Sequence, residues 1–123
     1  QKYEITSIFQ LGYPQQIALF NMLNRSGSSP LIMDAEDVLK NPKKMLNFLC
    51  NKLNIPFYKE MLYWPAGSRE SDGIWGQHWY GSVEASTGFQ SYIQKKGELP
   101  SKYRDIYTVC MENYEKLYSY RLQ

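Results

Sequence analysis

The stretch from Asp72 to Phe89, DGIWGQHWYGSVEASTGF, gathers the residues best suited to chemistry. It contains the only histidine, two of the three tryptophans and four of the eight glycines, with neither helical nor strand periodicity. Four of its side chains each have a ring that can stack and a polar atom that can hydrogen-bond: Trp75, His78, Trp79 and Tyr80. We expect a shaped loop, which is either a functional loop or an aromatic plug that closes the core.

The titratable residues limit the kinds of catalytic site that this sequence can form. An imidazole titrates near neutral pH, so His78 is a candidate for proton transfer, and a structural bond to a backbone carbonyl is the other interpretation. A single histidine without a G-x-S-x-G pattern argues against a hydrolase triad. Glu36 and Asp37 are adjacent, so they cannot face one another as a glycosidase pair does. One histidine and two distant cysteines give no metal-ligand spacing, and no metal site is expected.

The composition is that of a folded domain. Hydrophobic residues make up 43% and aromatic residues 15% of the 123 residues. A formal net charge of +2 gives no reason to expect binding to nucleic acid or to a membrane surface. No apolar run approaches the ~20 residues that cross a bilayer, and no secretory leader is visible. We therefore expect a cytoplasmic protein in which Cys50 and Cys110 are buried thiols on helix stripes.

Local signals at the start of the chain predict a helix and a strand. Gly12 and Pro14 mark the helix start, and the helix ends before Gly27; its inward stripe consists of Ile17, Phe20 and Leu23. The apolar run from Leu31 to Met33 is typical of a buried strand of a parallel sheet. Asp34 follows it at the edge where open α/β sheets bind ligands, and it also suits the cap of a short helical turn over 35–39.

Further helices are predicted downstream. Asn41 is a suitable N-cap and Pro42 a suitable first residue for a helix that ends at Asn54. A short helix is expected between Pro56 and Trp64, and a long C-terminal helix after Pro100. A single strand among helices leaves both strand edges unpaired. The rest of the sheet is therefore expected upstream of this chain.

Two stretches, PLIMDAEDVLKNPKKMLNFLCNKLNIPF and MLYWPAGSRESDGIWGQHWYGSVEASTGF, resemble P-loop sulfotransferases. The first resembles their late strand, acidic turn of YEDL type and Pro-started helix. The second resembles a divergent family of bacteria and plants that includes proteins named branched-chain-aminotransferase-like. The resemblance runs from about Leu11 to the C-terminus. It implies an α/β fold, the C-terminal part of a P-loop parallel-sheet sandwich, mostly helical here with one or few short strands, so that residues 1–123 form a partial domain.

The family resemblance also implies a reaction and a site. The reaction is transfer of a sulfuryl group from 3′-phosphoadenosine 5′-phosphosulfate to a hydroxyl or amine of a small-molecule acceptor. Sulfotransferases close a late R-K-G-x-x-G-D-W loop over the nucleotide, and Arg69, Gly73 and Trp75 follow a similar order. Arg69 is then a nucleotide contact, with a solvated loop cation as the other interpretation. His78 is the catalytic candidate because an imidazole can transfer a proton and this loop is expected to face the cleft, and Trp79 and Tyr80 beside it are the expected acceptor contacts.

The resemblance is to the C-terminal half of such an enzyme. The sequence has no G-x-x-x-x-G-K-[ST] pattern, so the phosphate cradle is absent and the segment alone is expected to be inactive. The alternative is a non-catalytic binding module in which the Trp and Tyr side chains form a partner surface. A phosphate loop upstream in the parent protein would favour the enzyme.

Overall fold

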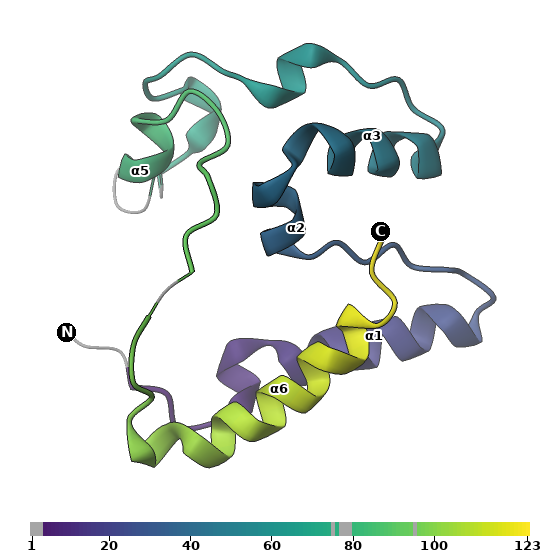
Figure 1. Cartoon of the computed structure of the whole chain (residues 1–123), viewed down its shortest axis with the longest axis vertical. Coiled ribbons are helices and arrows are strands. Elements are labelled where there is room, and N and C mark those ends of the chain that lie inside the picture. Colours follow the sequence, from purple (N-terminus) through teal and green to yellow (C-terminus); the bar gives the residue numbers. More distant parts are fainter. Residues whose placement is uncertain (1–3, 75, 77–79, 95) are drawn as a thin grey trace. The chain divides into compact units, whose positions relative to one another are not determined.

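The computed structural model describes residues 4–74, 76, 80–94 and 96–123. The chain divides into two compact units (Figure 1). The terminal unit combines residues 1–34 with residues 94–123, and the middle unit consists of residues 35–93. The described residues contain no helix that is both long and apolar enough to cross a membrane.

The terminal unit is a pair of packed helices with short extensions. Helix α1 (Tyr13–Arg25) follows a 3-10 turn, η1 (Ile8–Leu11), and helix α6 (Arg104–Tyr118) follows a second one, η4 (Ser101–Tyr103). The two α-helices pack against one another over part of their lengths (Figure 1). Their shared core holds Phe20, Cys110 and Leu117, which are 6%, 7% and 8% exposed. The predicted inward stripe of α1 is therefore confirmed at its central residue.

The predicted strand over 31–33 is present only as one bridge. Ile32 pairs in parallel with Arg121, and the Ile32 carbonyl oxygen accepts a hydrogen bond of 2.9 Å from the Leu122 amide. Residues 31–33 are half-buried rather than buried. A strand needs neighbours along its length to become a regular ladder, and within the described residues only the C-terminal segment supplies one.

The middle unit is built on helices α2 (Ala35–Lys40) and α3 (Pro42–Leu53), which pack together. The Asn41 side chain accepts the Lys44 amide at 3.1 Å, which confirms the predicted N-cap. Met45 and Cys50 are each 3% exposed and form the core of the unit. Both cysteines of the chain are free and buried, as predicted. The short turns η2 (Lys59–Leu62) and η3 (Glu70–Asp72) and helix α5 (Gly81–Glu84) complete the unit.

A small polar cluster joins α2 to the end of the middle unit. Lys40 forms an ion pair with Glu36 one helical turn earlier, and its ammonium lies 5.3 Å from the ring centroid of Tyr92. Hydrogen bonds from Lys40 and then from Tyr92 lower the pKa of the Glu36 carboxyl, and the bond to Glu36 raises the pKa of Lys40. The cluster connects residues more than fifty positions apart, by the count from Glu36 to Tyr92.

We expect an NMR titration to place the pKa of Glu36 below its ordinary value of 4.5. Lys40→Ala removes the main cause and should move this pKa upward, whereas Lys59→Ala, at an exposed position of the same unit, should not. Because the pKa of Glu36 is lower in the folded chain than in the unfolded chain, its ionised carboxylate stabilises the fold at pH values above the unfolded pKa. This stabilisation is lost as the pH falls through the folded pKa. If Lys40→Ala left the pKa of Glu36 unchanged, the cluster would not form in solution.

Candidate functional site

Residues 64–88 form a loop that the backbone closes at its base. Two hydrogen bonds join its ends: the Trp64 amide donates to the Thr87 carbonyl at 3.1 Å, and the Gly67 amide donates to the Glu84 carbonyl at 2.8 Å. Tyr63 and Gly88 form an antiparallel bridge just outside them. The two ends of the loop are thus paired like a minimal hairpin. We call residues 63, 64 and 86–89 the loop base.

Side chains reinforce the loop base. The Trp64 indole nitrogen donates to the Ser86 hydroxyl at 2.9 Å, and that hydroxyl donates to the Val83 carbonyl at 2.6 Å. The Trp64 ring meets the Phe89 ring edge-on, with centroids 5.5 Å apart and an interplanar angle of 77°. The Ser86 hydroxyl therefore acts as donor and acceptor at once, and it ties the indole to the end of helix α5.

Gly88 allows a close backbone approach in the same packing. A Cβ atom on Gly88 would lie 3.0 Å from the Leu62 carbonyl oxygen, which is backbone and cannot swing aside. Residues 86–89, STGF, all contribute to the loop base. Ser86 supplies a hydroxyl and Thr87 a backbone carbonyl, Gly88 allows the close approach of the Leu62 carbonyl, and Phe89 supplies a ring. Within the described residues, these four residues close the loop base.

The loop carries Arg69 and Gly73 on either side of η3. The Arg69 amide donates to the Asp72 carboxylate at 2.9 Å, which stabilises the turn. The Arg69 side chain is exposed and forms no ion pair with a described carboxylate. Gly73 has φ +66° and ψ −173°, a conformation essentially restricted to glycine. The structure therefore gives a backbone reason for the predicted glycine and leaves the guanidinium accessible.

Tyr80 lies farther along the same loop. Its amide donates to the Gly76 carbonyl at 3.0 Å, and the residue is 38% exposed. Helix α5 begins directly after it, so the stretch predicted to lack helical structure contains one helical turn. Glycine at 81 obscured this turn because glycine weakens a helix signal. Three predicted site residues lie outside the described residues: Trp75, His78 and Trp79.

The electrostatics of the loop limit what it can do alone. Residues 65–85 carry one arginine and three carboxylates, those of Glu70, Asp72 and Glu84. A guanidinium offers two parallel hydrogen bonds to a phosphate, but the neighbouring carboxylates oppose an anion. Residues 65–85 therefore offer an anion a single guanidinium, that of Arg69.

Comparison with known proteins identifies the family. Residues 2–120 match the family described as the sulfotransferase domain, which is nearly the whole chain. The chain belongs to this sulfotransferase family. The loop and its base are thus part of a sulfotransferase domain, and the resemblance seen in the sequence is confirmed. No solved structure matches the chain.

Two plant proteins are similar to this sulfotransferase-family chain. Branched-chain-amino-acid aminotransferase-like protein 2 of Arabidopsis thaliana is 32% identical over 117 residues, which cover 95% of this chain and 21% of the plant protein. Branched-chain-amino-acid aminotransferase-like protein 1 of the same plant is 32% identical over 120 residues, or 98% of this chain and 22% of the relative. The chain therefore spans about a fifth of the length of these curated relatives.

Sequence reasoning found the loop of this family member but not what closes it. Trp64 and Ser86 are 22 positions apart, and neither lies on a periodic stripe that would have paired them. The signals that were available are the tryptophan beside a proline and the small polar residues before Gly88 and Phe89. These residues indicate a turn, but they do not show that Trp64 bonds Ser86.

Proposed function

We propose that this chain is the C-terminal part of a sulfotransferase that uses 3′-phosphoadenosine 5′-phosphosulfate as donor. In the reaction the acceptor oxygen or nitrogen forms a bond to sulfur, the bond from sulfur to the bridging phosphate oxygen breaks, and the acceptor proton leaves to a base. Arg69 contacts a phosphate of the nucleotide, Gly73 lets the backbone come close, and Trp75 covers the base. His78 is the proton-transfer group, and Trp79 and Tyr80 face the acceptor.

The exposed guanidinium of Arg69 carries this proposal. It stands on a turn whose conformation is set by the Asp72 carboxylate and by Gly73, within a loop closed by the Trp64–Ser86 bond. A cation held on a shaped loop loses less freedom when it binds a phosphate than one on an unstructured segment. Membership of the sulfotransferase family supports a nucleotide phosphate as the ligand of this guanidinium.

We expect Arg69→Ala to weaken nucleotide binding by about 1.5 to 3 kcal/mol, the scale of a hydrogen bond to a charged group. The measurement is calorimetric titration of 3′-phosphoadenosine 5′-phosphate into a polypeptide that joins this segment to a phosphate-binding half. Arg104→Ala, an exposed arginine on α6 outside the loop, is the matched control. Equal affinities of the Arg69 and Arg104 variants would remove Arg69 from the nucleotide site.

Apolar exposure on the loop and its base favours a second candidate, a non-catalytic interaction module. Ile74 is 79% exposed, Tyr63 55% and Val83 53%. Exposed apolar side chains of this kind are found in protein-binding surfaces. A polypeptide that contains the phosphate-binding half but takes up no nucleotide in the same titration would support the module.

A further inference from the structure

The terminal unit contains a cavity of about 300 Å³ beside α6, which we call the apolar cavity. This volume is at the lower end of the range of small-molecule sites. Its walls come from the N-terminal segment at Ile5, from Leu11 and Tyr13 at the start of α1, and from residues 99–111. All of the lining residues belong to the terminal unit, so one compact body forms the cavity.

An ion pair holds two of these walls together. The Lys102 ammonium lies 2.6 Å from the Glu4 carboxylate, across 98 positions of the sequence. Ile5 follows Glu4 and Tyr103 follows Lys102, so the pair joins the N-terminal wall to the wall at η4. The side chains of Lys102 and Glu4 are 58% and 63% exposed. Their charges therefore lie in solvent at the edge of the cavity and are directed at one another.

The lining of the apolar cavity favours an aromatic guest. No described residue that lines it carries a formal charge. Besides aliphatic side chains, the lining has three tyrosine rings and two sulfur atoms, which belong to Tyr13, Tyr103, Tyr107, Cys110 and Met111. Aromatic rings and sulfur both make specific, favourable contacts with the face or edge of another ring. A planar ring system therefore gains contacts here that an aliphatic body of the same size lacks.

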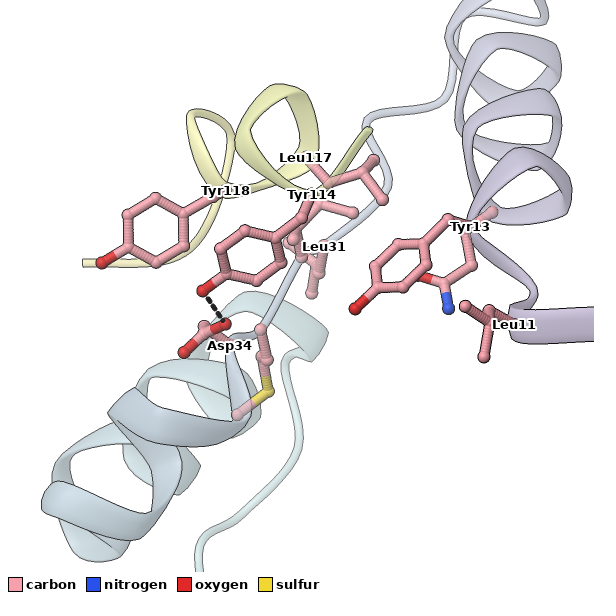
Figure 2. A pocket seen from close by; sticks show the side chains of 10 residues that line it. Leu11, Tyr13, Leu31, Asp34, Tyr114, Leu117 and Tyr118 are labelled. Atoms are coloured by element: carbon pink, nitrogen blue, oxygen red, sulfur yellow. Dashed lines mark hydrogen bonds between the residues drawn. The ribbon is translucent and has the colours of Figure 1, made fainter. Parts of the chain in front are cut away.

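A neighbouring hollow of about 430 Å³ has a different chemical character (Figure 2). It shares Leu11 and Tyr13 with the apolar cavity. The hollow in Figure 2 also contains the Asp34 carboxylate, which accepts a hydrogen bond of 2.9 Å from the Tyr114 hydroxyl. The two spaces therefore differ in charge, and a ligand selected for its lack of charge belongs to the apolar cavity.

We propose that the apolar cavity binds a neutral, planar aromatic compound of one or two fused rings. A cation is disfavoured because the Lys102 ammonium already lies 4.8 Å from the Tyr103 ring centroid and also pairs with Glu4. An anion is disfavoured because the described lining supplies no cation, and moving a charge from water to apolar surroundings is costly. Water in such a cavity finds few polar partners, so an apolar ring displaces it favourably. The inference does not depend on sulfuryl transfer, since binding needs no donor nucleotide.

Four bicyclic probes of similar size test this chemistry on the 123-residue chain. They are neutral quinoline, cationic N-methylquinolinium, anionic quinoline-2-carboxylate and 2-decalone, which is neutral but not planar. NMR titration at pH 7 should give quinoline a Kd of about 1 mM, as expected for a ligand of this size. Each charged probe should bind about tenfold more weakly, and 2-decalone about fivefold more weakly. Equal binding of quinoline and any other probe, a preference for a charged probe, or no binding of quinoline would overturn the proposal.

A variant and a map of chemical-shift changes assign the binding to the apolar cavity. Tyr107→Leu keeps an apolar wall but removes a ring, so it should weaken quinoline about fivefold and leave 2-decalone unchanged. The control is Tyr58→Leu in the middle unit, which should change neither; Tyr107 is 50% and Tyr58 57% exposed. On the unsubstituted chain, quinoline should shift the amides of Leu99, Ile106 and Met111 most.

Circular dichroism checks that the Tyr107 variant is folded. If it is folded and binds quinoline as tightly as the unsubstituted chain, the apolar cavity is not the site. If it is unfolded, the shift map and the probe series decide. Shift changes centred on the neighbouring hollow or on the middle unit would contradict the proposal.

Discussion

The purified 123-residue chain is expected to transfer no sulfuryl group from 3′-phosphoadenosine 5′-phosphosulfate to any acceptor. Sulfuryl transfer depends on preorganised amides and cations that stabilise the charge developing on the leaving phosphate. The sequence contains no G-x-x-x-x-G-K-[ST] cradle, and the loop over 65–85 offers Arg69 alone among three carboxylates. One exposed guanidinium cannot replace such a cradle.

The measurement is the release of 3′-phosphoadenosine 5′-phosphate with a panel of phenols and amines, compared with buffer. A polypeptide that adds a phosphate-binding half to the same segment serves as the positive control and should turn over the donor under identical conditions. Donor turnover by the short chain above the buffer rate would show that the catalytic groups lie within these 123 residues. The proposal that a separate phosphate-binding half is needed for transfer would then be wrong.

Helix positions could be predicted because their signals are local. Pro42 fits the first turn of α3 and the Asn41 side chain bonds the Lys44 amide three residues away, so the start of the helix is encoded within four positions. Gly12 precedes α1 with φ +78° in the same way. Each of these helix starts depends on residues that are neighbours in the sequence, so the sequence alone is enough to predict it.

Contacts between distant residues could not be predicted in the same way. Tyr114 and Asp34 are 80 positions apart, and no local pattern in the sequence pairs a helical tyrosine with an aspartate at that distance. The strand over 31–33 was assigned from its apolar run, but ladder formation depends on partners, and the structure gives Ile32 a single bridge. Periodicity shows which face is buried and does not show against what.

The candidate site shows the same division. Glycine at 73 was expected for its backbone freedom, and the structure confirms the need with a positive φ. Arg69 and Tyr80 lie on the predicted loop, but their roles toward nucleotide and acceptor depend on groups supplied by other parts of a sulfotransferase. The calorimetric titration of the Arg69→Ala variant tests the role of Arg69 toward the nucleotide.

Replacing Trp64 with alanine is expected to destabilise the middle unit by about 2 to 4 kcal/mol, somewhat less than the loss for a fully buried tryptophan because this one is half-buried. The substitution removes the ring contact with Phe89 and leaves the Ser86 hydroxyl without its indole donor. Urea unfolding followed by circular dichroism measures the change. Tyr63→Ala, which removes a neighbouring ring that is 55% exposed, should cost less than about 1 kcal/mol.

A double-mutant cycle separates the indole hydrogen bond from the packing of its ring. Trp64→Phe keeps an aromatic body and loses the donor, and Ser86→Ala loses the acceptor, so their coupling should be about 1 kcal/mol. If the bond closes the loop, each substitution should also speed hydrogen exchange at the Gly67 amide, which pairs with Glu84 across the loop. Additive effects with no change at Gly67 would mean that the backbone bonds alone close the loop, and Trp64 would then stabilise the unit without shaping the segment that carries Arg69.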